Sequence, residues 1–115
     1  MSGIRIDCRE SSPVGLDGGN REVRVILDVE SHPEAAVSLG RYQFKPLVTG
    51  PRHRHEVETE VYYCLEGSGT VVVGETVHHM TPGVTVCIPP KNDHQTTSGE
   101  AGFVFLAFFS PPIKF

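Results

Sequence analysis

The segment PRHRHEVETEVYYCLEG, residues 51–67, decides the fold and carries the chain's candidate chemistry. It contains two histidines two positions apart, His53 and His55, and Glu60 follows five positions later. Residues i and i+2 of an extended strand point to the same face, so the two imidazoles can reach one ion. Glu60 has the opposite parity for an uninterrupted strand. Residues 56–59 are therefore expected to turn, so that Glu60 opens a neighbouring strand and faces back toward the histidines.

A second segment, PPKNDH at residues 89–94, adds a further histidine after a Pro-Pro turn. Three imidazoles and one carboxylate form a ligand set for a single divalent transition ion, which can be Mn, Fe, Co, Ni, Cu or Zn. The ligand types alone do not select among these metals. The predicted metal ligands are His53, His55, Glu60 and His94.

The spacing of the two segments resembles the two sequence motifs of the cupin superfamily. Motif order and spacing both agree, and the spacer of 15 residues (68–82) is close to the shortest found in small single-domain cupins. The resemblance covers about residues 40–110 and implies an all-β fold, a double-stranded β-helix or jelly-roll barrel with little helix. The matching positions are His53, His55, Glu60 and Gly67 in the first motif and Gly83, Pro89 and His94 in the second.

Three positions depart from these motifs. Leu47 and Lys91 stand where the motifs usually have glycine, and Ser98 stands where the second motif usually has asparagine. These departures concern turn geometry and the hydrogen bonds around the ligands. All four ligand positions are intact.

Length, composition and charge limit the remaining possibilities. A chain of 115 residues is long enough for one core, and we expect a loop-rich arm at residues 1–20 and a single barrel domain at residues 21–115. The net charge of −4, with only 10 Lys+Arg, argues against nucleic acid as a partner. The longest apolar run, residues 103–109, is far shorter than the roughly 20 residues that cross a bilayer.

Cysteine usage and the beginning of the chain favour a cytoplasmic location. The first ten residues lack the apolar stretch of a signal peptide. The three cysteines are odd in number and form no close-spaced pair, which is typical of free thiols in a reducing compartment. They are Cys8, Cys64 and Cys87.

Short segments of alternating polarity, separated by 12 Gly and 9 Pro, predict β-strands. In residues 22–30 the apolar side chains of Val23, Val25 and Leu27 share one face. Gly74 and Glu75 form a predicted two-residue hairpin turn, and residues 98–102 carry a further turn signal. The predicted strands are residues 22–30, 37–45, 60–66, 70–73, 76–80, 84–88 and 102–109.

Two residues that share the parity of Glu60 are expected inside the barrel. Tyr62 is a tentative catalytic residue, because its hydroxyl can donate a hydrogen bond to a metal-bound substrate. Cys64 is a possible pocket thiol, although cysteine is also a common buried residue that only fills space. Glu60 itself is a candidate catalytic base if it detaches from the metal.

The strand before the first motif offers further pocket candidates. Either Arg41 and Gln43 point inward or Tyr42 does, and an inward arginine would suit a carboxylate or phosphate substrate. An exposed Arg41–Gln43 pair is the simpler alternative. Lys91, close before His94, can attract an anion at the pocket mouth or be an ordinary solvated loop residue.

Two classes of function remain open. The first is a small-molecule metalloenzyme, either a Lewis-acid isomerase, decarboxylase or lyase or an O₂-using dioxygenase. The second is a non-catalytic module that binds or senses a metal or small ligand. Apolar residues of both parities, as in residues 71–73, predict a two-fold homodimer into which the arm or first strand crosses. The segment of residues 110–115 is a second candidate for contact with the partner subunit.

Overall fold

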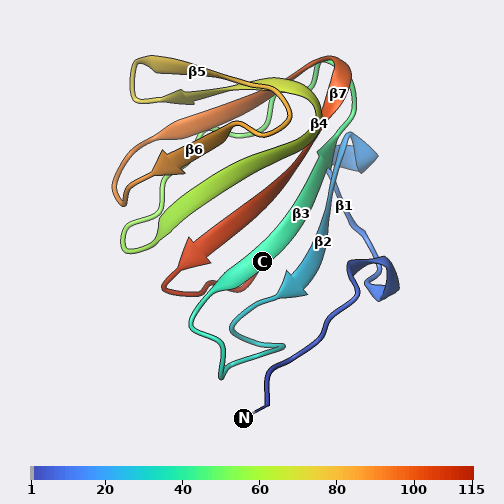
Figure 1. Cartoon of the computed structure of the whole chain (residues 1–115). Helices are drawn as coiled ribbons and strands as arrows, with labels where there is room; N and C mark the ends of the chain where they lie inside the picture. The colour runs from blue at the N-terminus through green and yellow to red at the C-terminus, as the bar shows by residue number, and fades with distance from the viewer. Residues whose placement is uncertain (1) are drawn as a thin grey trace.

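The computed structural model describes residues 2–115 and is mainly β-structure (Figure 1). Met1, the first residue of the predicted arm, lies outside the described residues. The only helices in the described part are two short 3-10 turns, so the expectation of an all-β fold with little helix is confirmed. In chain order the elements are η1 (Cys8–Glu10), β1 (Val14–Leu16), η2 (Asp17–Gly19), β2 (Arg21–Leu27), β3 (Ser38–Phe44), β4 (Thr59–Val73), β5 (Thr76–Met80), β6 (Thr85–Ile88) and β7 (His94–Ser110).

The strands form an antiparallel arrangement in the order β1-β2-β3-β7-β4-β5, and β6 pairs with β4. The long strands β4 and β7 pair with each other twice, residues 59–67 with 103–110 and residues 69–73 with 94–98. Figure 1 shows both strands curving from one part of the sheet into the other, so that the sheet wraps around an interior. This is the expected jelly-roll barrel.

Two glycines allow β4 and β7 to bend at the same level. Gly67 and Gly102 have φ of +71° and +80°, which glycine adopts without strain. A Cβ at Gly67 would lie 2.1 Å from the carbonyl oxygen of Gly102. Residues 60–66 and 70–73 are therefore one continuous strand and not two, and the turn expected at residues 98–102 is an irregularity within β7. The two-residue hairpin turn at residues 74–75 is confirmed.

Alternate residues of the strands face the barrel interior and form the core. One interior row runs across four strands, since Val23 pairs with Tyr42, Tyr42 with Phe105, and Phe105 with Cys64. The rings of Tyr42 and Phe105 stack with their centroids 5.3 Å apart. The core cluster also includes Phe44, Tyr62, Val71, Met80, Val86, Ile88, Phe103, Ala107 and Phe109.

The segment of residues 110–115, a candidate contact for a partner subunit, packs in part against its own chain. Ile113 exchanges two hydrogen bonds of 2.7 Å with the Ser38 hydroxyl, and the amide of Phe115 donates to the Asp28 carboxylate. The segment therefore follows β3, and the end of the chain lies over that strand in Figure 1. At the other end of the chain, β1 pairs with β2 of the same chain. No helix within residues 2–115 is long and apolar enough to cross a membrane.

Candidate metal centre

The four predicted ligands come together inside one end of the barrel. One ligand atom from each of His53, His55, Glu60 and His94 lies within 4.8 Å of the others. Glu60 is the second residue of β4 and His94 is the first residue of β7, whereas the other two histidines precede β4 in a nearly extended segment. Residues 56–57 bend, as the parity break in the sequence requires. An isolated bridge between His53 and His94 holds the two motifs together.

Three of the ligand atoms are buried and have no hydrogen-bond partner. Glu60 Oε1 lies 3.0 Å from His94 Nε2 and 3.4 Å from His55 Nε2, yet none of these atoms makes a hydrogen bond within residues 2–115. Buried polar atoms without a partner are costly and rare in folded proteins. A cation at their meeting point would satisfy all three, so the donor set fits a transition metal.

The Nδ1 atoms of two ligand histidines form hydrogen bonds with backbone carbonyl oxygens. His53 Nδ1 lies 3.0 Å from the carbonyl oxygen of Pro51, and His94 Nδ1 lies 3.0 Å from that of Asn92. A carbonyl oxygen only accepts, so each Nδ1 carries the proton that is donated. The Nε2 lone pairs are thereby left for the centre, and hydrogen bonds of this kind orient metal-binding histidines in proteins.

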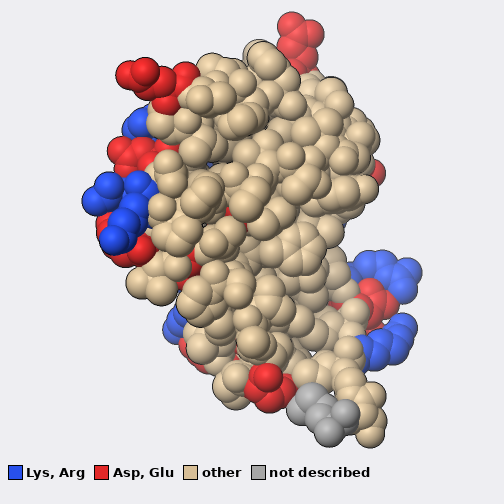
Figure 2. All heavy atoms as spheres, turned by 60° about the vertical axis from the view of Figure 1, so that its left-hand side comes forward, with Lys and Arg blue, Asp and Glu red and all other residues tan. Residues whose placement is uncertain are grey.

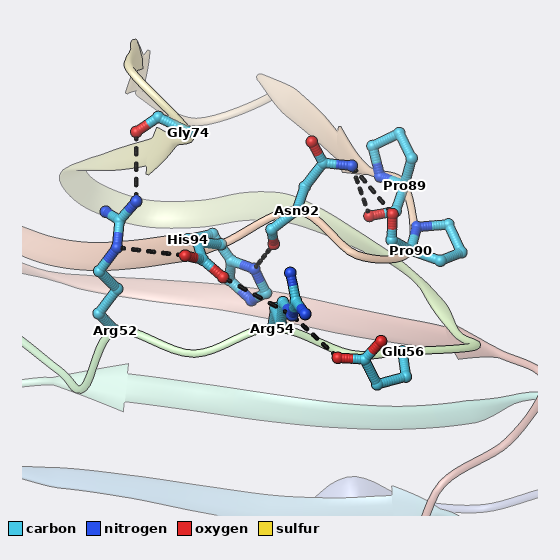
Figure 3. Close-up of polar contacts among 9 residues, drawn as sticks. Arg52, Arg54, Glu56, Gly74, Pro89, Pro90, Asn92 and His94 are labelled. Carbon is cyan, nitrogen blue, oxygen red and sulfur yellow. Dashed lines mark hydrogen bonds and ion pairs between the residues drawn. The ribbon is translucent and has the colours of Figure 1, made fainter.

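Polar contacts join the loops around His94 (Figure 3). The Asn92 side chain donates to the carbonyl oxygens of Pro89 and Pro90, which fixes the turn before β7. On the outside, the Arg54 guanidinium pairs with the Glu56 carboxylate at 2.9 Å. Arg52 and Arg54 also pair with Asp93, and these ion pairs are half exposed and each weak.

Burial and the ligands themselves set the protonation states. Burial alone would raise the pKa of Glu60, but His55 and His94 hold it below its usual value. Burial works to lower the pKa of His94, but the Glu60 carboxylate and the Asn92 carbonyl keep it raised. Burial lowers the pKa of His53. Glu60 is therefore an anion at neutral pH, as a metal ligand must be.

A cavity of about 200 Å³ opens beside the ligand cluster, and His53, His55 and Glu60 line it. The Thr96 hydroxyl donates to the Tyr62 hydroxyl over 3.4 Å, which leaves the phenol proton of Tyr62 uncommitted. Burial, reinforced by the Glu60 carboxylate, raises the pKa of Tyr42 to about 12, and Arg21 acts in the opposite direction. The other residues that line the cavity are Phe44, Gly50, Pro51, Phe105, Phe109, Ile113, Lys114 and Phe115.

Four residues predicted for the pocket do not line the cavity, namely Arg41, Gln43, Cys64 and Lys91. Tyr42 takes the inward orientation on β3, so Arg41 and Gln43 do not line the cavity. Cys64 is fully buried among core residues, where burial raises the pKa of its thiol. Lys91 is exposed in the loop outside the cavity and has a φ of +66°. Leu47, at the other position that is usually glycine, has a φ of +58°.

Sequence reasoning missed Arg21, Lys114 and Phe115, which all line the cavity. A signal for Arg21 was present, because it shares the parity of Val23 and Val25 on the predicted inward face. No local pattern pointed to residues 113–115.

Comparison with known proteins agrees with this architecture. A family model described as Cupin domain matches residues 40–109. An uncharacterized protein of Methanocaldococcus jannaschii is 33% identical over 61 residues, a match that covers 52% of this chain and 49% of that protein. The chain thus spans about half the length of that relative.

Solved structures share the fold at low sequence identity. KdgF from Halomonas sp. superposes with a TM-score of 0.83 at 16% identity, over 96% of this chain and 94% of that one. A predicted oxalate decarboxylase from Thermotoga maritima gives 0.84 at 22% identity, over 94% and 99%. The Bacillus subtilis oxalate decarboxylase, whose Mn(II) centres have been studied, gives 0.85 at 18% identity, over all of this chain but 31% of that one.

Proposed function

The chain belongs to the cupin family, and we propose that it is a metalloprotein in which His53, His55, Glu60 and His94 hold one divalent transition ion. The observation that carries the proposal is the convergence of buried, unpaired ligand atoms on one point. The donor set suits Mn, Fe, Co, Ni, Cu or Zn. Mn(II) in the Bacillus subtilis oxalate decarboxylase is a precedent from a structural neighbour.

The proposal includes catalysis on a small molecule in the adjoining cavity. When bound, the ion supplies Lewis-acid polarisation of a carbonyl or carboxylate oxygen or, if it is redox-active iron, a site for O₂ chemistry. Tyr62 faces the same cavity and donates its free phenol proton to the oxygen on which negative charge develops. Thr96 orients that phenol. This arrangement favours an isomerase, decarboxylase or lyase over simple binding, because it places a proton donor beside a charge-stabilising centre.

A small molecule fits the site better than a macromolecule does. The volume of the cavity, about 200 Å³, is smaller than that of most sites for drug-sized ligands, which supports a ligand of few atoms. The face shown in Figure 2 is mostly uncharged, and its Lys and Arg side chains lie beside Asp and Glu side chains. Together with the net charge of −4, this supports the absence of a nucleic acid partner.

The decisive experiment is the metal content of the untagged protein, measured by mass spectrometry. We expect close to one transition ion per chain in the wild type, and loss of most of it in Glu60→Ala and His94→Ala. His79→Ala is the matched control, because His79 is exposed on β5 and should not alter metal content. Equal trace metal in all four proteins would refute the site.

The same preparations separate the catalytic classes. Oxygen consumption with redox-active iron, on a panel of small carbonyl compounds, would favour a dioxygenase. Product formation without oxygen use would favour Lewis-acid chemistry. A loaded protein that binds the panel without turnover would be the non-catalytic alternative.

A homodimer is part of the proposal. On the outer face of the barrel, Leu39 pairs with Phe108, Phe108 with Val61, and Val61 with Cys87, which forms an apolar row across four strands. Tyr63 continues this face and is 40% exposed. A second copy of the chain is the proposed cover for this row. Sedimentation at micromolar concentration should give twice the chain mass, and the mass of one chain would refute the dimer.

A further inference from the structure

One cation on the inner face of the barrel has no role in holding a metal. Arg21 is the first residue of β2 and pairs with Phe44, which in turn pairs with Phe103. Phe44 and Phe103 are buried in the core, so this row faces inward. The Arg21 side chain is only 12% exposed and lines the cavity that Glu60, His53 and His55 also line.

The neighbours of Arg21 fix the guanidinium on one side and leave the other side free. Its Nε donates to the Asp17 carboxylate over 2.5 Å, and its Cζ lies 5.4 Å from the centroid of the Phe44 ring. Within residues 2–115 neither Nη atom makes a hydrogen bond to the protein. A guanidinium oriented in this way offers its two Nη groups as a planar fork that matches a carboxylate.

The remaining charges of the cavity favour an anion. Lys114 lies at the lining but is 67% exposed and paired with Glu30 at 2.7 Å. Glu60 is the one carboxylate in the described lining, and a divalent ion at the centre would more than neutralise it. The cavity thus has two electropositive regions, the proposed centre and Arg21, with hydroxyl groups nearby.

We infer that Arg21 is the specificity-determining residue of the site and binds a carboxylate of a small dicarboxylate or oxo-acid whose other end lies at the metal centre. Aromatic rings around the cavity pack against the carbon atoms between the two polar ends. Asp17 is a positioning residue that holds the guanidinium in place. This inference rests on the proposed function, since it assigns a substrate class to the same site.

The test is calorimetric titration of the manganese-loaded protein with malonate and succinate, compared with propionate and butyrate of the same carbon count. We expect at least one dicarboxylate to bind the wild type about tenfold or more tightly than its monocarboxylate. Arg21→Gln should weaken that dicarboxylate about tenfold to a hundredfold. Arg21→Lys keeps the charge but loses the planar fork of the guanidinium. Its dicarboxylate affinity should lie between those of the wild type and Arg21→Gln. Arg41→Gln is the matched control and should stay within about twofold, because Arg41 lies outside the cavity.

The outcomes separate this inference from the metal proposal. Unchanged dicarboxylate affinity in folded, metal-loaded Arg21→Gln overturns the role of Arg21 and leaves the metal site standing. Failure of the loaded wild type to prefer either dicarboxylate also overturns it. If the wild type and His94→Ala hold the same trace metal, the metal proposal fails. The role of Arg21 is then tested by titrating the chelator-treated protein with malonate and succinate. Weak malonate or succinate binding that Arg21→Gln abolishes would then support it, and no binding would overturn it.

Discussion

The ring of Phe115 lies against Gly40 so closely that a Cβ on Gly40 would be 2.8 Å from two ring carbons. Gly40 pairs across the sheet with Ala107, so two small residues lie side by side on the inner face. The space above them is filled by the Phe115 ring, which also packs edge-on against Phe109 with a centroid distance of 5.5 Å. Residues 113–115 therefore form one wall of the cavity beside the proposed metal centre.

Gly40→Ala should destabilise the protein by about 1–3 kcal/mol, because the added methyl group overlaps the Phe115 ring. The measurement is the free energy of unfolding in urea. Gly15→Ala is the matched control, since a Cβ there meets nothing within 4 Å, and it should change stability by less than about 0.5 kcal/mol. In a Phe115→Ala background the Gly40→Ala cost should nearly vanish. Additive effects in the double variant would contradict the contact.

The Asp28 carboxylate, which accepts a hydrogen bond from the Phe115 amide, makes the free energy of unfolding depend on pH. Burial would raise the pKa of Asp28, but the backbone amides of Ser31, Phe115 and Glu30 lower it overall. An unfolded aspartate titrates at about 3.9, so the carboxylate contributes stability above that pH and loses it as the pH falls through the lower folded value. Asp28→Asn should cost stability at pH 7 and much less near pH 3, as measured by urea unfolding.

The control for this pH dependence is Glu75→Gln, at the exposed tip of the β4–β5 hairpin. Its effect on the free energy of unfolding should be small at both pH values. An Asp28→Asn penalty of equal size at pH 7 and pH 3 would show that the carboxylate's charge does not matter.

Metal binding should raise thermal stability, because an ion that binds only the folded state adds to its free energy. At a free ion concentration of about 100 times Kd, the gain is about 2.7 kcal/mol, which corresponds to a rise in Tm of roughly ten degrees or more for a chain of this size. A melting scan of the chelated protein with and without Mn²⁺ measures it. His94→Ala should lose the rise and His79→Ala should keep it. The same rise in both variants would point to binding elsewhere.

The local parts of this architecture could be predicted from the sequence. Alternating Val23 and Val25 marked the inward face of β2, and the spacing of His55 and Glu60 required the bend that the structure has between them. These signals depend only on the two-residue period of a strand and on short-range spacing. The same parity extended by one step reaches Arg21, which lies more than thirty residues before His53 in the sequence and meets the site only through the folded sheet.

Contacts between residues far apart in the chain could not be predicted from the sequence. Gly102 was interpreted as part of a turn, whereas Gly67 and Gly102 allow two paired strands to bend together, which depends on a contact between residues more than thirty positions apart. Phe115 fills the space above Gly40, at a sequence separation that no periodicity reports. In both cases the deciding contact joins residues that only the folded sheet brings together.

Adjacent tyrosines on β4 provide a test of the site's proton donor with a built-in control. Tyr62 is buried and faces the cavity, whereas Tyr63 points outward and is 40% exposed. Tyr62→Phe removes only the hydroxyl, so metal content and fold should be retained. Dicarboxylate affinity should fall about threefold to tenfold, which is the net value of one hydrogen bond, and any turnover found with the panel should fall about a hundredfold or more.

Tyr63→Phe should leave metal content, dicarboxylate affinity and turnover unchanged, because its hydroxyl is on the opposite face of the strand. Calorimetry with malonate or succinate and the turnover assay measure both variants side by side. Equal behaviour of the two variants would remove Tyr62 from the chemistry. Loss of metal in Tyr62→Phe would instead mean that the phenol supports the ligands and does not act on the substrate. Retained metal with lost turnover is the result that follows if the free phenol proton is delivered to the oxygen polarised at the centre.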